Sequence, residues 1–241
     1  SARPPIPGLD GKNVITSTEA LNVEFLPKSL AIIGGGVIGM EIGSTYAKFG
    51  VEVTVLEALP HIVPSIDTDV REVLLHTSEK IMTIETGAMV KEIQDADNQK
   101  KVVYETQGER RECCAEKVMV CVGRCPNTKK LGLETAGIQV NKRGYIQVNS
   151  HYETTAPGVY AIGDVNGQVL LAHAASAQGI YVADRISGKQ TGINTKLIPS
   201  CIYTKPEIAC VGKTEDELKK ENIPYNVGKF PLSGNGKALS M

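Results

Sequence analysis

The sequence predicts an α/β protein in which a Rossmann-like βαβ unit carries an inserted antiparallel β-meander. Three observations support this fold class. The stretch "LAIIGGGVIGMEIG" (30–43) joins an apolar run to closely spaced glycines and then to a helix-like run. Strand-like and helix-like segments alternate around it, which is typical of a parallel sheet with crossover helices. After Gly87 the pattern changes to short strand-like runs separated by polar turns.

The first elements alternate between strand and helix. An unbroken apolar run at 29–34 predicts a buried parallel strand. Apolar residues spaced along one helix face predict a helix over 39–49, and Gly50 supplies its stop. The alternating, β-branched run 51–57 predicts the next strand. A proline-containing loop then leads to a helix over 67–80, which opens with two aspartates near its positive end.

The remaining elements begin with the meander, for which we expect strands at 88–94, 100–106 and 110–116. The buried-strand pattern returns at 117–123, so this run should pair back into the parallel sheet. The rest of the chain predicts a strand with a sharp end at 158–164, a helix from about 171 to 187, strands within 197–212 and a helix over 214–222.

Composition and charge limit the classes of partner. The 241 residues are 41% apolar, which is enough for a substantial core. Lys and Arg total 26 against 27 Asp and Glu, so no broad cationic field favours nucleic acid or an anionic membrane. No apolar run reaches the roughly 18 residues of a membrane span, and the first residues do not resemble a signal peptide. We therefore expect a cytoplasmic protein whose partners are small molecules.

Six cysteines could indicate a metal or redox site, or free thiols. No CxxC pair occurs, and the four histidines do not lie near the cysteines at ligand spacing. Free thiols that pack as small apolar side chains are the favoured interpretation. We therefore predict no metal site.

The glycines of the opening stretch have GxGxxG spacing. Gly34 would permit the tight turn, Gly36 would let a pyrophosphate approach the backbone, and Gly39 would let the helix approach the strand. The amides at the helix start would then face the anion. A glycine-rich turn that serves only chain reversal is the alternative. Because the motif follows a strand and opens a helix, dinucleotide binding is favoured.

Glu57, at the end of the next strand, indicates which dinucleotide. It lies about 20 residues beyond the glycines, where a carboxylate can accept hydrogen bonds from the adenosine ribose and would repel a 2′-phosphate. No arginine follows in 58–61 to receive such a phosphate. The pattern favours NAD over NADP, with a solvated acid at a strand end as the alternative.

Several segments together resemble the FAD-containing pyridine nucleotide disulfide oxidoreductases. "IIGGGVIGMEIG" with "VTVLEALPHIVPSID" resembles the family's NAD segment, and "CVGRCPNT" resembles its GRxPN turn. "TTAPGVYAIGDVNGQVLLAHAASAQG" resembles a second FAD segment, and "IPSCIYTKPEIACVGKTEDELKK" resembles the start of the interface domain. The resemblance implies four parts: the end of a first FAD segment (1–26), an NAD-binding domain (27–147), a second, central FAD segment (148–193) and part of an α+β interface and dimerisation domain (194–241).

The resemblance also implies cofactor contacts and their chemistry. Glu41 would help to order the nicotinamide and, in the family, pairs with a lysine beside the flavin. Val37 would border the nicotinamide pocket, Gly123 would let NAD lie against a strand end, and Val90 would contact the adenine side. The implied NAD contacts are Gly34, Gly36, Val37, Ile38, Gly39, Glu41, Glu57, Val90 and Gly123; the implied FAD contacts are Gly163, Asp164, Leu170, Leu171, Ala172 and His173.

The chain departs from the family in three places. It contains no first FAD-type GxGxxG, no CxxxxC redox pair and no terminal His and Glu acid-base pair. We therefore expect a truncated piece of an NAD-dependent enzyme of the dihydrolipoamide-oxidising type, without its own catalytic residues, and with FAD bound weakly or not at all. In the intact enzyme the resemblance implies a homodimer and a possible 2-oxo acid dehydrogenase complex. The alternatives are an NADH-dependent reductase of coenzyme A disulfide or oxygen, or a stand-alone, non-catalytic NAD-binding module.

Overall fold

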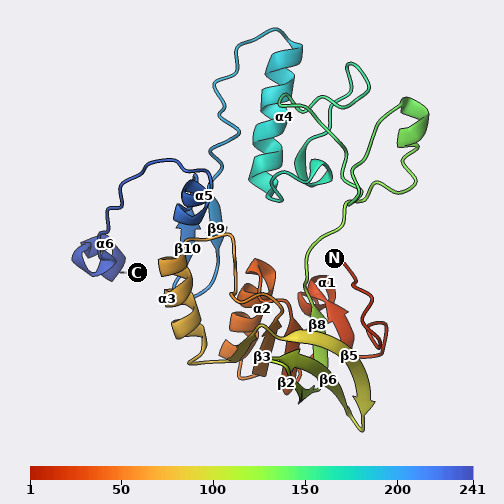
Figure 1. Cartoon of the computed structure of the whole chain (residues 1–241), viewed down its shortest axis with the longest axis vertical. Coiled ribbons are helices and arrows are strands. Elements are labelled where there is room, and N and C mark those ends of the chain that lie inside the picture. Colours follow the sequence, from red (N-terminus) through yellow and green to blue (C-terminus); the bar gives the residue numbers. More distant parts are fainter. Residues whose placement is uncertain (241) are drawn as a thin grey trace.

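The computed structural model describes residues 1–240 and divides into a sheet body, an upper body and a C-terminal segment (Figure 1). The sheet body contains β1 (Val14–Thr16), α1 (Ser17–Ala20), β2 (Ser29–Ile33), α2 (Val37–Lys48), β3 (Glu52–Glu57), α3 (Thr68–Ser78), β4 (Thr83–Thr86), β5 (Met89–Ala96), β6 (Gln99–Thr106), β7 (Glu109–Ala115) and β8 (Lys117–Val120). The upper body, residues 124–193, contains the 3₁₀ turns η1 (Leu133–Ala136) and η2 (Gly163–Asn166) and the helix α4 (Ala172–Ile186). The C-terminal segment contains β9 (Ser200–Ile202), β10 (Ile208–Cys210), α5 (Glu215–Lys220), η3 (Leu232–Gly234) and α6 (Gly236–Leu239).

The sheet body confirms the predicted fold class. Five strands form a sheet in the order β1-β8-β2-β3-β4, and every neighbouring pair is parallel. The strands β5, β6 and β7 form a separate antiparallel sheet between β4 and β8 in the chain, as expected for an inserted meander. β8 then pairs with β2, so the run that resumes the buried pattern does return to the parallel sheet.

β2 is the centre of the core because both of its faces are covered. All five of its residues are buried. Leu30 and Ile32 belong to one apolar cluster, with Met40 of α2. Ala31 and Ile33 belong to a second cluster that includes Val102 of the meander. Layers on both faces explain why β2 reads as a continuous apolar run rather than an alternating one.

The C-terminal hairpin packs on the helix side of the same core. Ile202 of β9 and Ile208 of β10 are buried in the cluster that contains Met40. In Figure 1 this hairpin and α5 lie beside α3. Asp67, the residue before α3, does not cap its own helix; its Oδ1 accepts a hydrogen bond from the amide of Glu215 at 2.8 Å. The segment is therefore tied to the sheet body by polar as well as apolar contacts.

The expected strand at 158–164 is wrong. The chain there forms an isolated antiparallel bridge between Glu153 and Tyr160, followed by the turn η2. The apolar pattern is strand-like, but a strand exists only when a neighbour completes its ladder, and the described residues supply one bridge. The neighbouring predictions are confirmed, since α4, β9, β10 and α5 all lie within their predicted ranges.

Candidate functional site

The three motif glycines occupy three different environments at the carboxyl end of β2. Gly34 has a φ of +111°, and a Cβ there would stand 2.8 Å from the carbonyl oxygen of Cys121. A Cβ on Gly39 would stand 2.0 Å from the carbonyl oxygen of Gly34, whereas one on Gly36 would meet no atom within 4 Å. The first and third glycines are thus required by the turn itself. The second faces open space.

That open space lies at the start of α2. Gly36 is the N-cap of this 12-residue helix and has no side chain to satisfy the first amides. Free amides at a helix N-terminus form an anion-binding site, and the aligned peptide dipoles favour negative charge there. The main-chain amides at Gly36 are bare and have open space in front of them. They therefore fit the diphosphate of a dinucleotide.

Glu57 lies beside the turn because β3 is parallel to β2 and ends at the same edge. It is 8% exposed. Its Oε2 accepts a hydrogen bond from the amide of Gly35 at 2.6 Å, and its Oε1 accepts one from the amide of Leu59 at 2.7 Å. A carboxylate offers about four lone-pair positions, so two remain for ribose hydroxyls. The acid is therefore held in place and still able to accept from a sugar.

Glu41, one turn into α2, makes a contact that the sequence did not predict. Its Oε1 accepts a hydrogen bond from the amide of Tyr203 at 2.8 Å, which joins α2 to the C-terminal hairpin. Val37 and Ile38 precede it and pack, partly buried, against the core. In the described residues Glu41 is thus a link between segments, and its role beside a nicotinamide stays a prediction.

Two further predicted NAD contacts lie on different sides of the sheet. Gly123 follows β8, has a φ of +120° and would meet no atom within 4 Å if it carried a Cβ. It is open, like Gly36. Val90 of β5 is 8% exposed and belongs to the apolar cluster between the sheet and the meander. Its side chain is a packing residue here, and a contact with adenine stays a prediction.

Two of the six predicted flavin residues, Asp164 and Leu170, line a cavity of about 310 Å³ between the upper body and the N-terminal residue Ser1. Seven residues outside the predicted set complete the lining, among them Arg124, Cys125 and Tyr145. Arg124 Nε lies 3.8 Å from Asp164 Oδ2. Arg124 belongs to the GRxPN turn, so the sequence did carry a signal for it.

Two buried polar side chains support the loop that carries Asp164. Gln178 of α4 is 1% exposed, and its Oε1 accepts hydrogen bonds from the Gly163 amide at 2.7 Å and from Asn166 Nδ2 at 3.0 Å. Asn166 Nδ2 also donates to the carbonyl of Ala161 at 3.1 Å. These bonds hold the backbone that precedes Asp164, at Ala161 and Gly163. Sequence reasoning missed both side chains.

The remaining predicted flavin residues lie at the start of α4 and differ in their surroundings. Leu171 is the N-cap of this 15-residue helix and makes no side-chain cap, and Ala172 is its first residue, so main-chain amides are again free. His173 does not line the cavity described above. Its Nε2 lies 2.7 Å from the carbonyl oxygen of Pro199. Since a carbonyl can only accept, Nε2 is the donor of this hydrogen bond. His173 thus ties α4 to the chain that leads into β9.

The six cysteines are free thiols in this structure. Cys121 lies beneath the glycine turn, with Sγ 3.2 Å from the carbonyl oxygen of Gly34 and 3.4 Å from that of Ile33. Burial, and to a smaller extent the charge of Glu57, raise the pKa of the Cys121 thiol to about 12. Cys201 and Cys210 sit one register step apart on β9 and β10, so their side chains point to opposite faces. Burial likewise raises the pKa of Cys113 to about 11.

Residues 1–240 lack two features that other functions would need. None of the helices combines the length and the apolar composition that crossing a membrane requires. No group of three or more histidine, cysteine, aspartate or glutamate side chains in this range is arranged to hold a metal ion.

Fold and glycine turn together define the class: a Rossmann-like α/β protein of the kind that binds dinucleotides. The chain belongs to the pyridine nucleotide-disulphide oxidoreductase family, whose sequence model matches residues 1–179. A second model, the dimerisation domain of the same family, matches residues 198–241. This family is that of the FAD-dependent pyridine nucleotide disulfide oxidoreductases.

Curated relatives cover nearly all of the chain. It is similar to the dihydrolipoyl dehydrogenase of Thermus scotoductus, at 43% identity over 235 residues, which is 96% of this chain and 51% of the relative. The dihydrolipoyl dehydrogenase of Trypanosoma brucei brucei is 40% identical over 238 residues, 96% of this chain and 50% of the relative. The chain thus spans about half the length of the curated relatives it matches.

Solved structures place the same fold in related enzymes. LpdA from Mycobacterium tuberculosis superposes with a TM-score of 0.88 at 28% identity, over 100% of this chain and 52% of that one. The HOCl-induced flavoprotein disulfide reductase RclA from Escherichia coli superposes with a TM-score of 0.87 at 30% identity, over 100% of this chain and 55% of that one. The mixed parallel and antiparallel architecture is therefore that of flavoprotein disulfide reductases.

Proposed function

We propose that this chain binds NAD at the glycine turn, as the NAD-binding part of a flavin-dependent dihydrolipoyl dehydrogenase. One observation carries the proposal: Gly36 faces open space at the start of α2 while Glu57 is held at the same sheet edge. The first would take the diphosphate and the second the adenosine ribose.

The residues would divide the work of holding NAD. The amides at the start of α2 would bind the diphosphate, and Glu57 would accept from the ribose hydroxyls and disfavour a 2′-phosphate. Val37 and the open backbone of Gly123 would border the nicotinamide end. NAD, when bound, would supply the hydride acceptor, while the chain would position and orient it.

The Asp164 cavity fits part of a flavin nucleotide by its chemistry. A carboxylate suits the hydroxyls of a ribityl chain, and the guanidinium of Arg124 suits a phosphate. Leu170 would cover an apolar ring edge, and the free amides at the start of α4 add further donors. FAD, when bound, would pass two electrons between a disulfide and NAD. Because this chain carries only part of these contacts, we expect weak FAD binding.

The activity of the whole protein is inferred from its relatives. Its reaction would be dihydrolipoamide and NAD to lipoamide and NADH, in a cytoplasmic homodimer that works alone or within a 2-oxo acid dehydrogenase complex. The 241 residues contain no CxxxxC pair to exchange with the substrate thiols. We therefore expect NAD binding without lipoamide turnover from this chain alone.

The domain limits are also a proposal. Thr128 Oγ1 donates to the carbonyl of Gly144, and the amide of Ile146 donates to the carbonyl of Val165. These bonds favour a boundary near Gly123, with 124–147 packed on the central segment rather than on the sheet. The limits expected from the sequence were 1–26, 27–147, 148–193 and 194–241.

Calorimetric titration of the chain with NADH and with NADPH tests the nucleotide proposal. We expect NADH to bind and NADPH to bind at least about tenfold more weakly, since a 2′-phosphate would meet the Glu57 carboxylate. E57A should reduce this ratio, and E52A, at the exposed start of the same strand, is the matched control. Absence of NADH binding at millimolar concentration would overturn the proposal.

A second candidate for the whole protein is a flavoprotein reductase of another disulfide. The likeness to RclA over the full length of this chain favours it. A longer reading frame, expressed and assayed with dihydrolipoamide and with other disulfides, separates the two candidates. Turnover of dihydrolipoamide with NAD supports the first candidate, and NADH oxidation by a different disulfide alone supports the second.

A further inference from the structure

The loop after β3 contacts the glycine turn from two directions at a residue outside the GxGxxG spacing. Gly35 stands between the first two motif glycines. Its amide donates to Glu57 Oε2 at 2.6 Å, and its carbonyl accepts from the amide of Val63 at 3.0 Å. Both peptide groups that flank Gly35 are therefore held by the segment 57–63.

The loop after β3 also packs closely against Gly35. A Cβ on Gly35 would stand 3.0 Å from Glu57 Cβ and 3.0 Å from Ile62 Cγ2. Ile62 and Val63 are 1% and 0% exposed, so the loop cannot retreat into solvent. Gly35, the middle glycine of the "GGG" run, thus has a structural reason of its own, which is contact with the loop after β3.

Val63 adopts a backbone conformation that valine rarely takes. Its φ is +39°, although the branched Cβ makes positive φ unfavourable. Such outliers persist where the surroundings over-determine them, and they cluster at functional sites. In this conformation the Val63 amide donates to the Gly35 carbonyl.

We propose that Glu57 is a positioning residue as well as a ribose ligand: with Val63 it clamps Gly35 and fixes the glycine turn before a nucleotide arrives. The inference rests on the proposed NAD function. Glu57 would thus act twice, through one oxygen lone pair on the turn and through another on the sugar. Glu57 would affect the diphosphate site by holding the Gly35 peptide in place, and not by contacting the diphosphate itself.

The substitution E57Q separates these two roles. A glutamine can accept from only one of the two amides, because its NH2 group would face the other donor. In the chain without ligand, we expect amide hydrogen exchange at Gly35 and Leu59 to accelerate about tenfold or more, since each loses a bond to a charged acceptor. E52Q, at the exposed start of β3, is the matched control and should leave both rates unchanged.

The affinity for a nucleotide analogue distinguishes the clamp from a direct contact between Glu57 and the ribose. NADH without the adenosine 2′- and 3′-hydroxyls cannot use Glu57 as a ribose ligand. If the clamp exists, E57Q should still weaken this analogue about tenfold, although removing a negative charge near a diphosphate would by itself favour binding. If Glu57 acts only on the ribose, E57Q should not weaken the analogue.

The outcomes distinguish the clamp from the nucleotide proposal. Unchanged exchange at Gly35 and Leu59 in E57Q overturns the clamp, even if NADH affinity falls. Absence of NADH binding by the wild-type chain overturns both the NAD function and the purpose of the clamp, whatever the exchange rates. If E57Q does not fold, E57D replaces it: it keeps the charge but is one methylene too short to reach both amides, so exchange at one of them should rise. Equal exchange in E57D and wild type then overturns the clamp.

Discussion

Glu57 and Asp164 are the two carboxylates that the sequence assigns to the sugar parts of nucleotides, yet their surroundings differ. Glu57 is 8% exposed and accepts from two main-chain amides. Asp164 has a side chain that is 51% exposed and pairs with Arg124 at 3.8 Å. A buried acid with its donors in place is a preformed site, whereas a half-exposed acid keeps its water until a ligand replaces it. The glycine turn should therefore bind its nucleotide without help, and the cavity should not.

The largest expected effect is the loss of NADH binding when the open space at Gly36 is filled. Gly36 has a φ of −72° and a ψ of −175°, which valine tolerates, and a Cβ there meets no atom within 4 Å. We expect G36V to fold normally and to weaken NADH by about 100-fold, or about 2.7 kcal/mol, because its methyl groups would stand where the diphosphate must lie. Calorimetric titration measures this loss, and unchanged affinity would show that the diphosphate binds elsewhere.

A change at Gly39 should act on folding instead. A Cβ at this position would stand 2.0 Å from the carbonyl oxygen of Gly34, so G39A forces the helix away from the strand. We expect a loss of about 2 kcal/mol of unfolding free energy, within the range for overpacked sites. Chemical denaturation measures it. If G39A were as stable as wild type, the close approach described above would be incorrect.

The substitution Q178L tests whether nucleotide binding by the sheet body is independent of the stability of the upper body. It removes the acceptor that Gly163 and Asn166 share: the buried Gly163 amide is left without a partner, and Asn166 Nδ2 keeps only its bond to the carbonyl of Ala161. We expect a loss of about 1–3 kcal/mol of stability, since unsatisfied buried groups keep their desolvation cost. NADH affinity should not change, because Gln178 lies in the upper body. Weaker NADH binding by Q178L would break the comparison, because it would show that the upper body supports the glycine turn.

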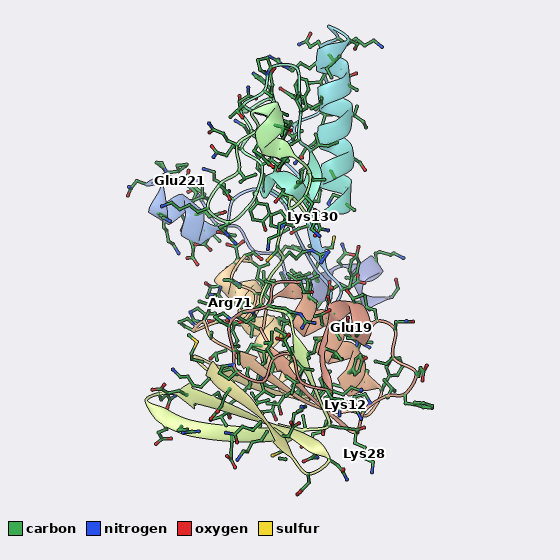
Figure 2. All side chains as sticks on the ribbon, turned by 90° about the vertical axis from the view of Figure 1, so that its right-hand side faces the viewer. Lys12, Glu19, Lys28, Arg71, Lys130 and Glu221 are labelled. Carbon is green, nitrogen blue, oxygen red and sulfur yellow. The ribbon has the colours of Figure 1, made fainter. Side chains whose placement is uncertain are left out.

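Elements that depend on residues close together in the chain could be predicted from the sequence, whereas elements that depend on distant partners could not. The pattern from Ser29 to Glu57 is local, so strand, turn, helix and acid were all predictable from spacing. The strand at 158–164 was predicted wrongly because its existence depends on a neighbour that the pattern cannot supply. Figure 2 shows the sheet body and the upper body from the side: Glu19, Lys28 and Arg71 lie in the sheet body, away from α4.

The same reasoning explains the residues that were missed at the site. Gln178 is a polar residue on a helix, which ordinarily predicts an exposed position, and only the packed fold makes it 1% exposed. No sequence pattern announces the positive φ of Val63, because valine disfavours it. Arg124 differs from both, since it belongs to a recognised turn. A residue whose role depends on distant contacts cannot be predicted from its neighbours in the chain.

Alkaline pH should affect the glycine turn to a smaller extent, through Cys121. Because the pKa of this thiol is raised from 9.0 to about 12, the unfolded chain releases its proton first, and stability falls as pH rises through that window. At pH 10 the loss should be about 1.4 kcal/mol. Comparing C121A with wild type between pH 8 and 10 isolates this effect, and C114A, at an exposed thiol, is the control. An equal pH dependence of C121A and wild type would contradict the assignment.

The smallest effect is expected for D164N, the counterpart of the Glu57 substitutions. A half-exposed ion pair at 3.8 Å contributes little, so the unliganded chain should lose less than about 0.5 kcal/mol. E57Q should lose more, because it disturbs two bonds of a buried acid to main-chain amides. Thermal unfolding of both variants at the same protein concentration measures the difference directly. A loss from D164N equal to that from E57Q would mean that the cavity is as preformed as the glycine turn, and this chain should then bind FAD without further residues.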